Sequence, residues 1–66
     1  MTGLFDKLPT QVSIERQIAC VEREIKQREY VYPRRVQDGQ MKIDKAHEEI
    51  AVMRAVLATL KEKANP

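Results

Sequence analysis

The chain has 66 residues, with twelve basic and ten acidic side chains and 42% apolar residues. A single core in a chain below roughly 70–80 residues rarely supplies more than ~3–5 kcal/mol, so further stabilisation is needed. The lone Cys20 excludes an internal disulfide, and one cysteine with the single His47 cannot build a structural zinc site within one subunit. Oligomerisation is the source of stability that remains. The net charge of +2 is too small to indicate a nucleic-acid partner by itself.

Residues 1–12 predict a partly mobile lead-in segment, because Gly3 and Pro9 interrupt scattered apolar residues. A segment that docks on the helices or on a partner through Phe5 is the alternative. The segment has no apolar core or cleavage pattern of a signal peptide. The chain also lacks the run of ~18 apolar residues that a membrane-spanning helix needs, so we expect a cytoplasmic protein.

Residues 13–37 predict the first helix, in a single helical domain that extends over residues 13–63. Ser13 suits the N-cap position, where its hydroxyl accepts from backbone donors of the first turn. Apolar residues then recur at steps of three and four, which is typical of one helix face. They are Ile14, Ile18, Val21 and Ile25, with Tyr32 on the continuation of the same stripe.

Pro33 interrupts the first helix, since it removes one helical hydrogen bond and disfavours the helical conformation at Tyr32. We expect a kink at Pro33 and an extension to about residue 37. A helix that ends near Val31 is the alternative. Asp38 and Gly39 form a stop signal, so the turn is expected at about residues 38–41 with Gly39 in the left-handed conformation.

Residues 42–63 predict the second helix. Its apolar stripe consists of Ile43, Ala46, Ile50, Met53, Leu57 and Leu60. A second row of Val52, Val56 and Thr59 widens the apolar face beyond what one short neighbouring helix can cover, and a second copy of the chain is the natural cover. The expected fold is therefore all-α, an antiparallel two-helix hairpin that dimerises into an assembly resembling a four-helix bundle. The expected dimer or hairpin core is Ile18, Val21, Ile25, Ile50, Met53, Val56, Leu57 and Leu60.

Residue patterns typical of catalysis are missing from the sequence. His47 lacks the second histidine four residues later that a zinc-binding protease helix requires. Cys20 has no base near it in sequence, and Gly3 and Gly39 are too isolated for a phosphate-binding loop. We expect no enzyme activity, no catalytic residues, no metal and no cofactor.

The stretch around Pro33 is the most distinctive surface candidate. Tyrosine and arginine are enriched at binding hot spots, because they combine rigid area or a planar guanidinium with hydrogen-bonding groups. The candidate partner-binding residues are Tyr30, Tyr32, Arg34 and Arg35. In the alternative interpretation, Tyr32 closes the end of the core and the two arginines only keep the surface soluble.

The sequence also resembles a family of small phage and prophage helical-hairpin proteins, which includes the quorum-sensing anti-activator of Pseudomonas phages. The resemblance covers roughly residues 13–60, and its most specific piece is Val31-Tyr32-Pro33-Arg34. The other matching pieces are residues 13–25, Gly39 with Met41, residues 53–57, and Thr59 with Leu60.

The resemblance implies a homodimer of hairpins in the cytoplasm of an infected host cell. It implies binding to the DNA-binding domain of a LuxR-type quorum-sensing transcription factor, and also to the ATPase of type IV pilus assembly. Two positions depart from the family pattern. Arg35 replaces a usual aromatic residue, and Lys42 replaces a usual capping Thr or Ser. If that aromatic residue contacts the partner in the relatives, the target differs here.

The sequence therefore leads to the hypothesis of a homodimer that binds and inhibits a host regulatory protein, with no membrane partner. One alternative is a small DNA-associated phage regulatory factor that uses Arg34, Arg35, Lys42 and Lys45. A structural bundle element of a larger assembly is another alternative.

Overall fold

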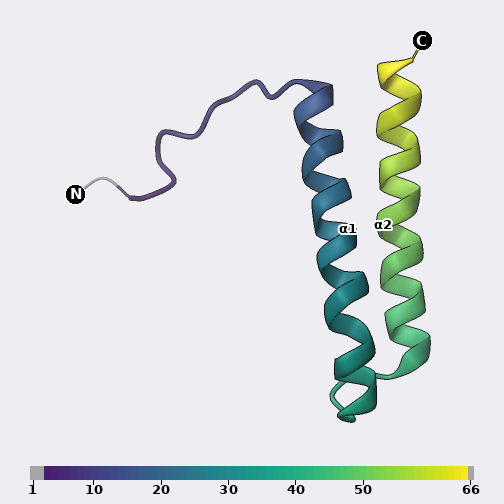
Figure 1. The fold of residues 1–66 in the computed structure, drawn as a ribbon. Coiled ribbons are helices and arrows are strands. Elements are labelled where there is room, and N and C mark those ends of the chain that lie inside the picture. The colour runs from purple at the N-terminus through teal and green to yellow at the C-terminus, as the bar shows by residue number, and fades with distance from the viewer. Residues whose placement is uncertain (1–2, 66) are drawn as a thin grey trace.

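The computed structural model describes residues 3–65, which form two antiparallel helices joined by a short turn (Figure 1). Helix α1 spans Ile14–Gln37 and helix α2 spans Ile43–Ala64. The predicted all-helical hairpin is confirmed. The expected helix ranges of 13–37 and 42–63 compare with 14–37 and 43–64 in the structure.

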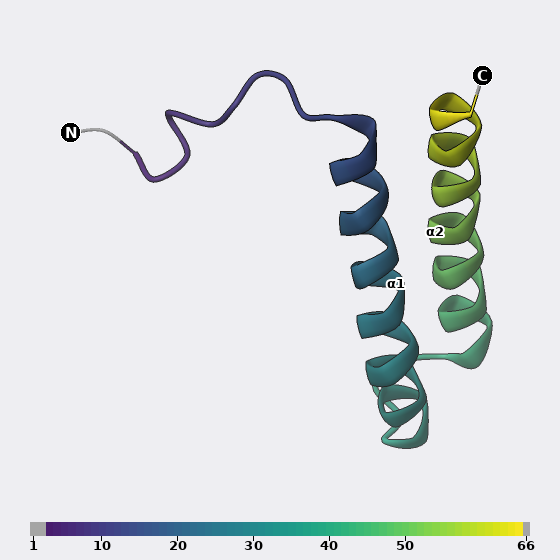
Figure 2. The same cartoon turned by 45° about the horizontal axis from the view of Figure 1, so that its top comes forward.

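The segment before α1 leaves the hairpin at the end opposite to the turn and runs away from both helices (Figures 1 and 2). It contains no helix between residues 3 and 12. Residues 1 and 2 of the expected lead-in lie outside the described residues. Neither helix in the described part of the chain is long and apolar enough to cross a membrane.

Helix α1 begins at a side-chain cap and continues through its proline. Ser13 has an extended backbone, and its hydroxyl oxygen accepts a hydrogen bond from the backbone N–H of Arg16 at 3.1 Å. This cap satisfies one of the donors that the first turn leaves unpaired, which confirms the predicted role of Ser13. The helix extends past Pro33 to Gln37, so the alternative end near Val31 is wrong. The kink at Pro33 stays a prediction.

The turn is fixed by backbone hydrogen bonds that close the end of α1. The N–H of Gly39 donates to the carbonyl of Val36 at 3.1 Å, and the N–H of Gln40 donates to the carbonyl of Arg35 at 2.8 Å. These two bonds form a Schellman motif, which requires a left-handed backbone conformation at the residue just after the C-cap. Gly39 supplies it with φ +76°, as the sequence predicted. The chain then reverses within five residues and starts α2.

The interface between the two helices buries very little. Ile25 and Ala46, each 6% exposed, are the only buried hydrophobic residues among those described. Most of the expected core is only half-buried in the single hairpin. This half-buried group consists of Ile18, Val21, Ile50, Met53, Leu57 and Leu60. Val56 from the expected core is 43% exposed, and Ile43 from the expected α2 stripe is 56% exposed.

The accessible surface of the hairpin is large for its mass. The chain exposes 5950 Å², whereas a folded monomer of 7.7 kDa exposes about 4,300 Å². The excess is about 1,600 Å² per chain, which lies in the range that one protomer buries in an obligate dimer. Residues 3–13, which are all exposed and run away from the helices, contribute to this excess (Figure 1).

The start of α2 provides a test of helix capping. Lys42 occupies the N-cap position with an extended backbone, and its side chain makes no capping hydrogen bond. Replacing Lys42→Ser adds a hydroxyl acceptor and removes a positive charge from the positive end of the helix dipole. We expect the free energy of unfolding to rise by about 1 kcal/mol, measured by urea denaturation at fixed protein concentration. Lys42→Ala removes the same charge without adding an acceptor, and an equal gain from it would contradict the capping explanation.

Candidate functional site

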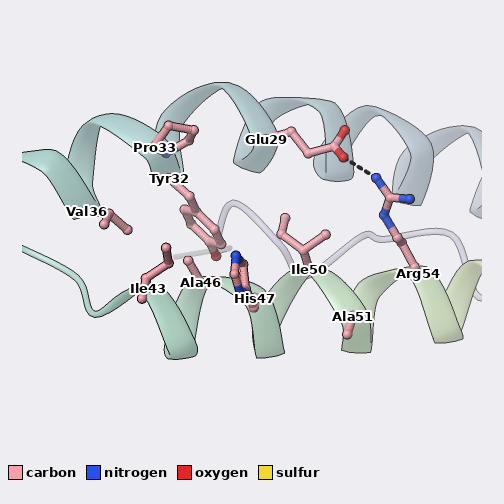
Figure 3. A pocket seen from close by; sticks show the side chains of 10 residues that line it. All are labelled: Glu29, Tyr32, Pro33, Val36, Ile43, Ala46, His47, Ile50, Ala51 and Arg54. Carbon is pink, nitrogen blue, oxygen red and sulfur yellow. Dashed lines mark hydrogen bonds and ion pairs between the residues drawn. The ribbon is translucent and has the colours of Figure 1, made fainter.

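An apolar groove lies between the two helices near the turn (Figure 3). It has a volume of about 740 Å³. Its floor and walls come from Tyr32, Pro33 and Val36 of α1 and from Ile43, Ala46, Ile50 and Ala51 of α2. Glu29, His47 and Arg54 complete its lining. We call this feature the turn-end groove.

Tyr32 belongs to this groove and not to the outer surface. Its ring points from α1 toward α2, where it lies near Ala46 and His47 (Figure 3). The side chain is half-buried. This placement favours the alternative interpretation in which Tyr32 closes the end of the hairpin core.

The other three candidate partner-binding residues lie together on the outer side of α1. Tyr30, Arg34 and Arg35 line a shallow depression of about 490 Å³ that also reaches the turn residues Asp38 and Gln40. Tyr30 is 84% exposed, and both arginines are exposed. Tyr30 and Arg34 are one helical turn apart, so they present neighbouring side chains to a partner. We call Tyr30, Arg34 and Arg35 the turn-end surface.

One edge of the hairpin is held by charges. Glu29 pairs with Arg54 across the two helices, and Glu22 pairs with Lys61 at 3.6 Å. Each helix spaces its two charged residues seven positions apart, which is close to two full turns. Both ion pairs therefore lie on the same edge, which we call the charged edge. All four side chains are exposed, so each pair stabilises the hairpin by less than about 1 kcal/mol.

The opposite edge of the hairpin is apolar. Cys20 lies two residues before Glu22 in α1, and Val56 lies two residues after Arg54 in α2. Two residues correspond to about 200° around a helix axis, so Cys20 and Val56 point away from the ion pairs. Cys20, Val21, Val56 and Leu60 line a depression of about 590 Å³ on this side, together with the polar side chains of Arg16, Gln17 and Arg23. Val52, one turn before Val56, is 52% exposed. We call Val21, Val52, Val56 and Leu60 the apolar edge. Among the described residues, both ion pairs between the helices lie on the charged edge.

Two cations pair with a carboxylate one turn away on their own helix. The pKa of Lys45 is raised mainly by its hydrogen bond to Glu49 and also by the negative charges of Glu49 and Glu48. The pKa of Arg28 is raised mainly by its hydrogen bond to Glu24. Within residues 3–65, no group of three or more His, Cys, Asp or Glu side chains is placed to hold a metal ion.

Sequence reasoning missed the turn-end groove, although two signals pointed to it. Ile43 begins the apolar stripe of α2 one turn before Ala46, at a level that faces the last turn of α1. Pro33 adds an apolar ring there. Ile43 is nevertheless 56% exposed.

Comparisons with protein-family models, with curated proteins and with solved structures found no match for this chain. The similarity to phage anti-activators therefore stays a prediction from the sequence. The function has to be argued from the turn-end groove, the turn-end surface and the apolar edge.

The two tyrosines give a test that separates folding from binding. Tyr32→Ala removes a half-buried ring between the helices, whereas Tyr30→Ala removes a ring that is 84% exposed. We expect Tyr32→Ala to lower the free energy of unfolding by about 1–3 kcal/mol and Tyr30→Ala to change it by less than about 0.5 kcal/mol. Thermal unfolding followed by circular dichroism measures both variants at the same concentration. Equal losses for the two variants would contradict this assignment.

Proposed function

We propose that this chain is a non-catalytic inhibitor that acts as a homodimer of helical hairpins and binds a host regulatory protein. The proposed target is the DNA-binding domain of a LuxR-type quorum-sensing transcription factor, with the type IV pilus assembly ATPase as a second target. The choice of target comes from the sequence resemblance. The observation that carries a binding function is the exposed Tyr30 beside Arg34 on a rigid helix end.

The dimer is supported by the apolar residues that the single hairpin leaves exposed on α2. Val52 and Val56 lie one turn apart on the apolar edge and are 52% and 43% exposed. A two-fold axis beside this edge lets each copy cover the valines of the other, because such an interface is self-complementary. The charged edge remains on the outside of this pair.

Binding through the turn-end surface is supported by its composition. Tyrosine provides rigid contact area with a hydrogen-bonding tip, and arginine binds carboxylates in a bidentate manner. Arg34 and Arg35 lie in the last turn of α1, where the Schellman motif fixes the backbone. Little conformational entropy is then lost in this backbone when a partner binds.

Inhibition of a transcription factor needs no chemistry from this chain. A mimic of DNA would be acidic, whereas this chain carries a net charge of +2. The proposed mechanism is therefore steric, with the hairpin covering the receptor surface that DNA would contact. A dimer presents the turn-end surface twice, and against a dimeric receptor avidity adds ~10²–10⁴ in affinity where both sites engage together.

The apolar edge gives the test of the dimer. Val56→Lys places two charges in the proposed two-fold interface but leaves each hairpin able to fold, because Val56 is already 43% exposed there. We expect the dissociation constant of the dimer to rise by at least about 100-fold, which corresponds to roughly 3 kcal/mol. Sedimentation equilibrium over micromolar concentrations measures it.

Ala58→Lys is the matched control for the dimer test, since it changes an exposed position of α2 between Arg54 and Lys61. The dimer should persist in this variant. A well-folded monomer of the unaltered chain at micromolar concentration would overturn the proposed dimer.

The turn-end surface gives the test of partner binding. Tyr30→Ala combined with Arg34→Ala should weaken binding to a purified LuxR-type DNA-binding domain by about 10–100-fold, since hot-spot truncations each cost about 1–2 kcal/mol. Isothermal titration calorimetry measures the affinity. Lys26→Ala is the control, because Lys26 is an exposed cation of α1 that lines neither the turn-end surface nor the depression at the apolar edge. Unchanged affinity in the folded double variant would end the hot-spot proposal.

The same purified chain and receptor domain test the DNA-associated alternative. Direct binding of the chain to DNA, with affinity that falls steeply as salt is added, would favour that alternative over inhibition of a receptor. Displacement of the receptor from its promoter DNA, without contact between the chain and DNA, supports the proposed function.

A further inference from the structure

The turn-end groove lies on the outside of the proposed dimer. It opens on the charged edge, where Glu29 and Arg54 line it and pair across the two helices (Figure 3). The proposed dimer packs on the apolar edge, so the second copy leaves the groove open. The segment before α1 leaves the hairpin at the end opposite to the turn and runs away from both helices (Figures 1 and 2). An apolar groove of about 740 Å³ therefore remains on the face that the dimer offers to other molecules.

The dimensions of the groove limit what can enter it. Glu29 and Val36 mark the two ends of its α1 wall, and they are seven residues apart, which is about 10 Å along the helix axis. Two apolar side chains one helical turn apart, at about 6 Å, fit within this length. The Glu29 carboxylate is paired with Arg54, so this pair presents no uncompensated charge to an apolar occupant.

Pro33 connects the groove to the turn-end surface, because its ring lines both the groove and the shallow depression on the outer side of α1. Around the axis of α1, Tyr30 lies about 60° from Pro33 and Arg34 about 100° from it, both on the side away from the groove. The α1 wall of the groove therefore continues into an exposed aromatic ring and then into an exposed guanidinium.

The charge of Arg34 is not neutralised by an ion pair. No ion pair within residues 3–65 includes Arg34, although Asp38 lines the same depression. A guanidinium beside an apolar groove complements a segment that carries a carboxylate next to apolar side chains. The phosphate backbone of DNA would satisfy the guanidinium, but it has no apolar group to place in the groove.

We propose that the turn-end groove and Arg34 together bind an acidic amphipathic helix of the partner. Two apolar side chains of this helix, one turn apart, enter the groove, and a carboxylate beside them pairs with Arg34. Amphipathic helices bind apolar grooves of other proteins in this way. The inference rests on the proposed function, because it specifies the chemistry of the partner at the same end of the hairpin.

Two matched peptides test the charge requirement. The acidic probe is a fluorescein-labelled helical peptide with two leucines one turn apart and two glutamates along one side of them; its twin has lysines in place of the glutamates. Fluorescence anisotropy should show that the full chain binds the acidic probe at least about tenfold more tightly than the twin. Arg34→Ala should weaken the acidic probe by about 3–10-fold and leave the twin unchanged. Lys26→Ala, outside the groove and the depression, should change neither.

Ala51→Gln tests the groove itself. It places a polar amide in the groove lining at an exposed position of α2, so the hairpin should still fold. Affinity for the acidic probe and for the LuxR-type DNA-binding domain should fall by about tenfold. Ala58→Gln is the matched control, because it lies seven residues later on the same face of α2 and outside the groove lining. Circular dichroism checks that both variants are folded.

The outcomes separate this inference from the proposed function. Unchanged affinities in the folded Ala51→Gln variant, with receptor binding still weakened by Tyr30→Ala combined with Arg34→Ala, would overturn the inference and leave the proposed function intact. Binding of the acidic probe with the expected losses, but no binding of the LuxR-type domain, would support the inference and end that target.

Other occupants of the groove would give different results. A weaker dimer in the Ala51→Gln variant would place a second copy in the groove, and tighter binding of the acidic probe after Phe5→Ser would place the chain's own N-terminal segment there. Displacement of the acidic probe by a short DNA duplex at equal concentration would assign Arg34 to phosphates. Each of these results, like equal affinity for the acidic probe and its twin, would contradict the proposed helix.

Discussion

The structure depends on the burial of apolar side chains between two helices. Two helices alone cannot cover the whole of each other's apolar stripes. Two helices in contact along one line bury the residues on that line, and here that line holds Ile25 and Ala46. Every other apolar residue of the two stripes retains contact with water, at a cost of about 25 cal/mol for each Å² that a third surface would remove. Covering these residues with a further apolar surface would therefore stabilise the hairpin.

Charge and apolar character are divided between the two edges of the hairpin by helix geometry. The heptad spacing of Glu22 with Glu29 and of Arg54 with Lys61 keeps both ion pairs on one edge. A second copy packed on that edge would have to desolvate these exposed charges, which is unfavourable unless new partners replace water. At the apolar edge, the valines need no such compensation, although Arg16 and Arg23 line the depression beside them. In the proposed dimer, the weak surface ion pairs favour one edge for association more than they stabilise the hairpin.

The sequence predicted the elements of the fold but not the depth at which residues lie. Periodicity predicted both helices, Ser13 supplied a recognisable cap and Gly39 a recognisable stop, because these signals are local in the chain. Val56 is 43% exposed in the single hairpin, because periodicity indicates which face of α2 is apolar but not how far around it the opposite helix reaches. The turn-end groove was missed for a related reason. It arises where α2 begins opposite the last turn of α1, and the relative placement of two helix ends is not encoded in either stripe.

In the proposed function, one helical segment around Pro33 serves both folding and recognition. Residues two positions apart in an α-helix are separated by about 200° around its axis. Tyr32 therefore points toward α2, whereas Tyr30 and Arg34 point outward. Tyr32 lies in the groove against α2, and the Schellman motif closes the backbone at the end of α1, so the outward residues keep a fixed spacing. A partner that binds Tyr30 and Arg34 would therefore meet a preorganised surface. Conservation of the inward tyrosine would then be expected in any relative that keeps this fold, whereas the outward residues would vary with the target.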